Sequence, residues 1–163
     1  YLFTYLFPQL WESFNKTQQT ALTYSIENLL TNRLAPEPVY HNSAKTILTA
    51  VSSCYPLPII RPEIIHFLAT SHNSWNIAIP LLQAYTKYLP ESDKYIYLLE
   101  NLYHRLSERE LEIGWKMIRS SNETTKSSLN TFLIADWDKA RAEFEKILGS
   151  GDTEDVDILE NSW

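Results

Sequence analysis

Histidine and cysteine, the most common zinc ligands, are few and widely spaced in this chain of 163 residues. Its histidines are His41, His66, His72 and His104, and no two have the four-residue spacing that places two imidazoles on one helix face. The single cysteine, Cys54, ends an apolar helical stripe, and no neighbour in the sequence would stabilise its thiolate. We therefore expect no metal centre, and we expect Cys54 to be a packed structural residue.

Motifs for group transfer are absent from the sequence. It has no Gly-x-Ser-x-Gly motif, no glycine-rich phosphate loop, and no Asp-Phe-Gly or His-Arg-Asp signature. Acidic residues gather between Asp152 and Glu160, but the glycine and the final glutamate of a calcium loop are not at the required spacing. We expect no catalytic residue and no cofactor, and we interpret residues 149–158 as an acidic connecting loop.

One cluster of cations is a candidate partner-binding site. Arg109 and Lys116 are seven residues apart and so return to nearly the same helix face, and Arg119 lies about 60° from Lys116 around the helix. Such a stripe could dock an acidic peptide. The alternative is a solvated face on which Glu108 and Glu112 balance the cations.

Bulk composition indicates a folded protein that does not bind nucleic acid. Apolar residues make up 44% and aromatic residues 13%, which exceeds what a disordered chain contains. The net charge of −6 is unfavourable for binding phosphates. A single cysteine favours a reducing compartment. The opening residues carry no basic segment and are interrupted by Pro8, so we expect an internal fragment of a longer protein with no signal peptide or membrane span.

The apolar spacing predicts helices nearly everywhere, about nine in all. Arg61-Pro62-Glu63 is typical of a helix start, with proline at the first position and an acid in the first turn. Pro80 predicts a kink or a late helix start, because it removes a backbone donor. Ser107-Glu-Arg-Glu110 matches a capping box. The predicted fold class is all-α, a helical repeat of the TPR-like or HEAT-like α-solenoid type.

Two segments in the second half carry the clearest helical stripes. After Ser107, one side of the expected helix holds Leu111, Trp115 and Ile118, and a second side holds Ile113 and Met117, which predicts packing against two neighbours. We interpret residues 91–148 as TPR-like helix pairs. In the last helix, Asp136 to Leu148, the stripe expected to be buried contains Trp137, Ala140, Phe144 and Ile147, while Lys139 and Glu143 face water.

A series of motifs occurs in a characteristic order along the whole chain. The series is Pro8-Gln-Leu-Trp11, Gln18-Gln19-x-x-Leu22, Ser43-Ala44, Cys54-x-Pro-x-Pro58, Ile60-Arg-Pro62, His72-Asn-x-Trp75, Leu102-Tyr103, Trp115, Glu123-Thr124, Leu159-Glu160 and Trp163. In this order they resemble the FAT region of TRRAP-type transcription-associated pseudokinases, within the phosphatidylinositol-3-kinase-related family.

The resemblance implies a nuclear, non-catalytic α-solenoid that packs around a kinase-like domain. Proteins of this family serve histone-acetyltransferase coactivator complexes of the SAGA kind and contact sibling subunits and transcription activators. The chain departs from the family pattern at Pro80, at Ala135 in place of a glycine, and at the short Gly149-Ser-Gly151 segment. On this view an acidic activator segment is the expected partner of the stripe formed by Arg109, Lys116 and Arg119.

An independent TPR adaptor that holds a peptide is the alternative from another class of function. A carboxylate-clamp adaptor needs lysine and asparagine side chains that converge on one concave face. The asparagines Asn101, Asn122 and Asn130 show no such repeat. The sequence therefore favours the scaffold.

Overall fold

The computed structural model describes residues 2–32, 43–89, 93–120, 122–134 and 136–150. These ranges contain nine α-helices and no strand, which confirms the predicted all-α helical repeat. The helices are α1 (Leu2–Ser13), α2 (Lys16–Asn32), α3 (Ser43–Ser52), α4 (Pro62–Ser71), α5 (Trp75–Tyr88), α6 (Asp93–Arg105), α7 (Arg109–Arg119), α8 (Glu123–Leu133) and α9 (Trp137–Ser150). No helix within these ranges is both long enough and apolar enough to cross a membrane.

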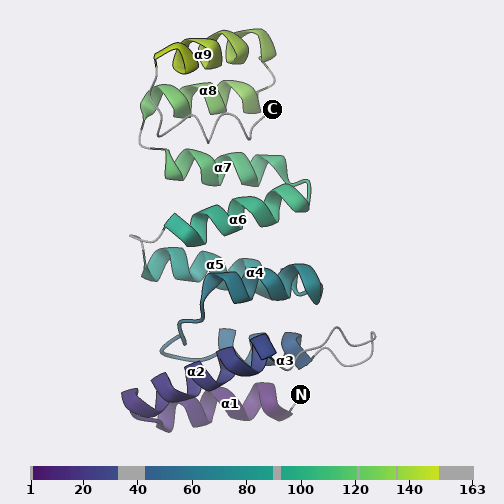
Figure 1. The fold of residues 1–163 in the computed structure, drawn as a ribbon, viewed down its shortest axis with the longest axis vertical. Coiled ribbons are helices and arrows are strands. Elements are labelled where there is room, and N and C mark those ends of the chain that lie inside the picture. Colours follow the sequence, from purple (N-terminus) through teal and green to yellow (C-terminus); the bar gives the residue numbers. More distant parts are fainter. Residues whose placement is uncertain (1, 33–42, 90–92, 121, 135, 151–163) are drawn as a thin grey trace. The chain divides into compact units, whose positions relative to one another are not determined.

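The chain divides into two compact units, residues 1–98 and 99–163, and the division falls inside α6. In the first unit, α1 packs on α3 and α3 packs on α5, while α2 packs on α4 (Figure 1). Contacts between every second helix are typical of stacked helical hairpins, in which each hairpin buries its apolar side against the next. The first unit is therefore built as a helical repeat.

The motif residues near the start of the chain join the first three helices. Trp11 in α1 is 2% exposed, and its indole Nε1 donates to the Pro56 carbonyl at 2.7 Å. The Gln19 amide of α2 donates to the Trp11 carbonyl at 3.0 Å. Pro56 follows a cis peptide bond after Tyr55. These bonds hold the extended segment after α3 against α1, so the motifs that carry the resemblance determine how the helices join.

A buried carboxylate fixes the start of α4. Glu27 of α2 is 8% exposed and accepts from the Arg61 backbone N–H at 2.7 Å and from Arg61 Nε at 3.1 Å. Pro62 is the first residue of α4 and Glu63 lies in its first turn, as the sequence predicts. The backbone donor of Arg61 is thus satisfied at the helix start, where α4 itself offers no acceptor.

The hydroxyl of Tyr85 ties α5 to the same connection. Tyr85 is fully buried, donates to the Pro58 carbonyl, and accepts from the Ile60 N–H at 3.3 Å. Its ring centroid lies 5.3 Å from that of Tyr95 in α6. Burial raises the pKa of the Tyr85 hydroxyl far above its usual range. The hydroxyl therefore serves as a neutral hydrogen-bonding group.

Replacing Tyr85 by phenylalanine is expected to lower the free energy of unfolding by about 1–3 kcal/mol, because two buried backbone groups lose their partner. Urea denaturation followed by circular dichroism measures the change. Tyr5→Phe is the matched control, since Tyr5 is 69% exposed, and it should alter stability by under about 0.5 kcal/mol. Equal effects of the two substitutions would contradict the assigned role of Tyr85.

Two helices end at residues whose backbone takes the left-handed conformation, with positive φ. Asn73 (φ 49°) follows α4, and the Ser74 N–H donates to the Ala69 carbonyl at 3.3 Å. Ser107 (φ 60°) follows α6, where the Ser107 N–H donates to His104 and the Glu108 N–H donates to Tyr103, both at 3.0 Å. Both bonds of a Schellman motif are present after α6.

The predicted capping box at Ser107 is therefore wrong. The N-cap residue of α7 is Glu108, and it makes no side-chain cap hydrogen bond. Ser107 instead takes the left-handed conformation that terminates α6.

Prolines interrupt the helices less than the sequence suggests. Helix α1 continues through Pro8. Helix α5 begins at Trp75 and continues through Pro80, so the predicted alternative of a late helix start is wrong.

The core of the second unit is formed by α7, α8 and α9. Its buried residues are Ile113, Leu129, Phe132, Ala140, Phe144 and Ile147, with Met117 and Leu133 packed against them. Most of the stripe predicted for α9 is confirmed. Trp137 is the exception, because it is 54% exposed and meets Phe132 edge-on at 4.7 Å.

The predicted acidic loop of residues 149–158 falls only partly within the described residues. Gly149 and Ser150 belong to α9, so they do not end the helix as the sequence suggested. Residues 151–158 lie outside the described residues, as does Ala135.

Candidate functional site

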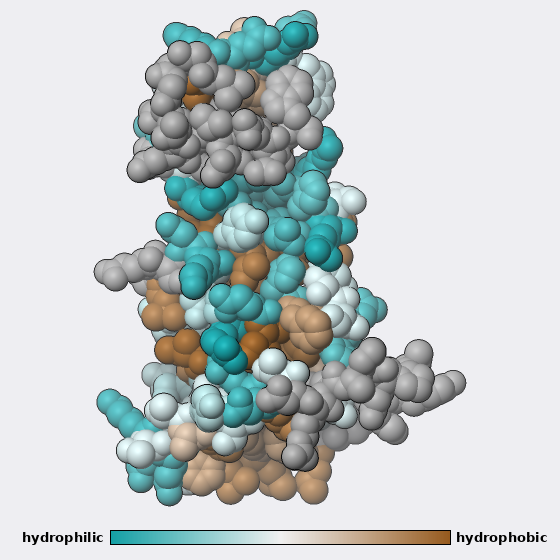
Figure 2. Space-filling view, viewed as in Figure 1, coloured by the Kyte–Doolittle hydropathy of each residue, from teal (hydrophilic) through white to brown (hydrophobic). Residues whose placement is uncertain are grey.

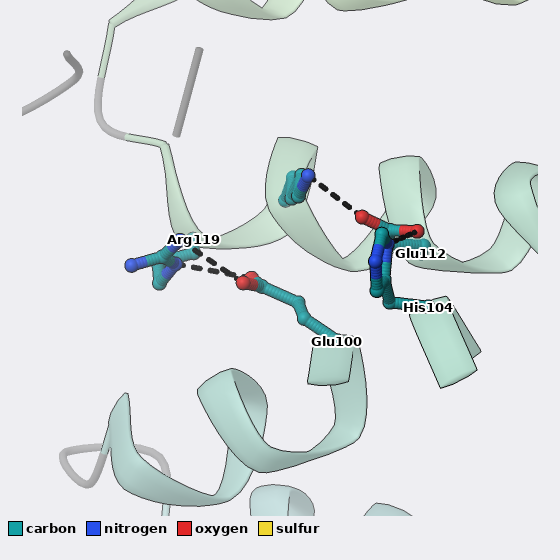
Figure 3. A network of polar contacts seen from close by, with 5 residues as sticks. Glu100, His104, Glu112 and Arg119 are labelled. Atoms are coloured by element: carbon teal, nitrogen blue, oxygen red, sulfur yellow. Dashed lines mark hydrogen bonds and ion pairs between the residues drawn. The ribbon is translucent and has the colours of Figure 1, made fainter. Parts of the chain in front are cut away.

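Two of the three candidate cations, Lys116 and Arg119, lie in a network of charged groups between α7 and the last part of α6 (Figure 3). Glu100 of α6 is 5% exposed, and Arg119 of α7 reaches it with two parallel bonds. Arg119 Nε donates to Oε1 and Nη2 donates to Oε2, each at 3.0 Å. This two-point geometry is the strongest form of an arginine–carboxylate contact.

A second ion pair lies within α7. Lys116 Nζ is 2.8 Å from Oε1 of Glu112, and both side chains are nearly fully buried. His104 of α6 places Nδ1 at 3.2 Å from the other carboxylate oxygen of Glu112, although its own side chain is 68% exposed. Glu112 therefore links the two helices, with a buried cation on one oxygen and an exposed imidazole on the other.

Burial raises the pKa of the Glu100 carboxyl above its usual range. Arg119 opposes this shift by its charge and its hydrogen bonds, and Lys116 opposes it more weakly, while Glu112 adds to it. Glu100 thus carries a buried charge that depends on Arg119 for its stabilisation.

The three predicted cations do not form one exposed patch. Lys116 is 3% exposed and paired with Glu112, and Arg119 is paired with Glu100 with about a quarter of its side chain exposed. Arg109 is exposed. Lys116 and Arg119 are turned towards Glu112 and Glu100, so the exposed stripe expected from the spacing does not form. Partner binding by Arg109 stays a prediction.

Of the two apolar sides that the sequence predicted for α7, the side with Ile113 and Met117 packs into the core of the second unit. The other side is largely open to solvent. Leu111 is 49% exposed and Ile118 is 63% exposed, while Trp115 is half-buried. Glu112, Ile113 and Lys116 are the buried residues of this helix. α7 therefore buries an ion pair beside Ile113 and leaves Leu111 and Ile118 exposed, which is unusual for a surface helix.

A second apolar surface covers α1 in the first unit. Figure 2 shows hydrophobic residues gathered over this helix, at the lower end of the view. The exposed apolar residues of α1 are Leu2, Phe3, Tyr5, Leu6 and Leu10. Beside them a hollow of about 300 Å³ opens between α1, α2 and α3, with a mostly apolar lining that includes Phe3, Ile26 and Ile47.

The thiol of Cys54 is buried and hydrogen-bonded. Cys54 is 6% exposed, and its thiol donates to the Ala50 carbonyl at 3.2 Å. Burial, with a smaller contribution from Glu12, raises the pKa of the thiol to about 11. Across the described residues, no three histidine, cysteine or acidic side chains come together as metal ligands. Cys54 is a packed structural residue, as the sequence predicted.

The chain matches no protein-family model and no curated protein. Its family is therefore a prediction that rests on the ordered motifs.

Proposed function

We propose that this chain is a non-catalytic scaffold segment of a pseudokinase subunit in histone-acetyltransferase coactivator complexes of the SAGA kind, acting in the nucleus. In this role the helical repeat supports a kinase-like domain in the longer protein and presents surfaces to sibling subunits and transcription activators. No nucleic acid or membrane is a direct partner, and the segment itself carries no cofactor.

The observation that carries this proposal is the position of the ordered motif residues. Trp11, Gln19, Pro56, Arg61 and Asn73 lie where helices begin, end or join, and most make the bonds that set one helix against the next. A series of residues that specifies how repeats stack is what a scaffold family would retain in its sequence. The motifs thus have a structural role consistent with that of a solenoid segment.

The proposed lack of catalysis predicts that ATP with Mg²⁺ produces no stoichiometric heat when it is titrated into the chain. The physical reason is that the sequence has neither a phosphate-binding loop nor the acidic residues of a kinase metal site in their required order. Isothermal titration calorimetry measures this. A saturable site with micromolar affinity would contradict the proposal.

The complex itself is tested by affinity purification of the longer protein that contains this segment, followed by quantitative mass spectrometry. We expect an acetyltransferase and its sibling subunits to be enriched with the tagged protein. The matched control carries Leu129→Asp, which places a charge in the fully buried core of the second unit and should release partners held by the folded scaffold. Purification without any acetyltransferase subunit would refute the proposal.

A further inference from the structure

The open side of α7 has the pattern of a helix–helix interface without a second helix. Leu111, Gly114, Trp115 and Ile118 are spaced i, i+3, i+4 and i+7, so they form one stripe along the helix. Leu111 and Ile118 are each about half or more exposed. An apolar stripe of this spacing is what one amphipathic helix presents to another.

Gly114 gives an independent indication that another backbone approaches here. Among the residues that the structure describes, a Cβ placed on Gly114 would meet no atom within 4 Å, so none of them requires a glycine at this position. Glycine in the middle of a helix weakens that helix relative to alanine. Glycine within a helix often lets another backbone come close, as at the crossing point of two helices.

The charges beside the stripe are acidic. Glu108 is three residues before Leu111, and Glu110 is four residues before Gly114, so each adjoins the stripe; both are exposed. Arg109 lies instead beside Glu112 and Ile113 on the other side of the helix.

The nearest cation at the far end of the stripe already forms an ion pair within the chain. Arg119 is bound to Glu100 through both parallel bonds. In α7 and at its N-cap, the charges that remain beside the stripe are therefore those of Glu108 and Glu110.

We propose that this stripe is a docking site for an amphipathic helix of a partner protein that carries lysine or arginine beside its apolar side. Leucine-like side chains of the partner would contact Leu111, Trp115 and Ile118, and its backbone would cross at Gly114. Its cations would face Glu108 and Glu110. This partner has the opposite charge to the acidic segment that the sequence suggested, because the structure uses Lys116 and Arg119 internally.

The same argument disfavours two other occupants. Residues 151–163 of this chain are strongly acidic and would be repelled by Glu108 and Glu110. A second copy of the chain would bring the same two glutamates to the interface. The proposal concerns only the surface of α7, and it stands whether or not the longer protein belongs to an acetyltransferase complex.

Two synthetic helical peptides test the proposal, each about five turns long with leucines at i, i+3, i+4 and i+7. One carries lysines beside the leucines and the other carries glutamates. Fluorescence anisotropy of each labelled peptide is measured with the full chain at low and physiological salt. We expect the lysine peptide to bind at least about tenfold more tightly than the glutamate peptide, with the difference shrinking as salt rises.

Three variants separate a specific site from general attraction to an acidic protein. Leu111→Ser with Ile118→Ser should weaken binding about tenfold, while the control Leu10→Ser, which removes an equally exposed leucine from α1, should not. Glu108→Lys with Glu110→Lys should reverse the preference between the peptides. Gly114→Leu should keep or raise the melting temperature, since a Cβ at this position meets no atom of the described residues within 4 Å and leucine favours a helix more than glycine does, yet it should weaken binding by blocking the close approach.

Several results would overturn the proposal. Equal binding of the two peptides would show that the stripe does not prefer a basic helix. Tighter binding by the Gly114→Leu variant would show that affinity depends only on the apolar area and not on a close approach of backbones. A higher affinity after Leu159→Ser with Trp163→Ser would show that the chain's own C-terminal residues occupy the stripe. A dimer in sedimentation equilibrium that Leu111→Ser with Ile118→Ser converts to a monomer would make the occupant a second copy.

Discussion

Replacing Phe144 by alanine is expected to lower the free energy of unfolding by about 3–5 kcal/mol, because the ring is 1% exposed at the centre of the second unit. Its neighbours include Phe132, with ring centroids 6.3 Å apart, and the change would leave a cavity that the surrounding helices fill only in part. Urea denaturation followed by the helical signal in circular dichroism measures the loss.

The matched control for Phe144 is Lys139→Ala, an exposed position on the same helix. It should change the free energy of unfolding by less than about 0.5 kcal/mol. If both variants lost the same small amount, the buried side of α9 would be misassigned and the core of the second unit would have to lie elsewhere.

Replacing Arg119 by methionine is expected to lower the free energy of unfolding by about 2–4 kcal/mol at neutral pH. The substitution leaves the Glu100 carboxylate buried without its strongest counter-charge. The control is Arg141→Met, which removes an exposed partner of Glu145 and should cost under about 0.5 kcal/mol.

The cost of Arg119→Met should depend on pH in a definite direction. Burial already raises the pKa of Glu100, and loss of Arg119 removes the main opposing effect, so the pKa rises further in the variant. When the pKa of a carboxyl is raised in the folded state, the free energy of unfolding falls as pH rises from the ordinary pKa towards the raised value. The difference between variant and wild type should therefore shrink as pH falls from neutral towards the ordinary range for glutamate.

Urea titrations of both proteins at several pH values measure this dependence. A cost that is the same at every pH would mean that Arg119 contributes by packing and not by stabilising the Glu100 charge. A cost near that of Arg141→Met would mean that the bidentate pair is no more stabilising than an exposed one.

Local rules in the sequence predicted most of the helices. The start of α4 followed from proline at its first position and an acid in its first turn, and most of the buried stripe of α9 followed from the apolar spacing. Ser107 was misread because serine is typical of a helix start, whereas the left-handed residue that ends a helix is usually glycine or asparagine. The two backbone bonds after α6 decided between them, and no sequence rule reveals those bonds.

The candidate site was predicted less well, for a physical reason visible in α7. Helical spacing shows that Glu112 and Lys116 share one side and that Leu111, Trp115 and Ile118 share another. It does not show which side meets the neighbouring helices, because that depends on packing between α6, α7 and α8. Tertiary packing buried the side with the ion pair, so Trp115 is only half-buried and Lys116 is inaccessible.

Buried carboxylates were the features that sequence reasoning missed. Glu27 lies three residues before the buried Leu30, and Glu100 lies three residues before the buried Tyr103, so each acid interrupts an apolar stripe. A charge at such a position signals a partner on another helix, and here the partners are Arg61 and Arg119. The signal indicates that a partner exists, but only the fold identifies it.

The scaffold role is tested most directly by the acetyltransferase activity that accompanies the longer protein from nuclear extract. The proposed function predicts that immunoprecipitates of the wild-type protein acetylate nucleosomal histones, and that Leu129→Asp, which disrupts the second unit, removes most of that activity without changing the acetyltransferase itself. Wild-type immunoprecipitates without acetyltransferase activity would contradict the account.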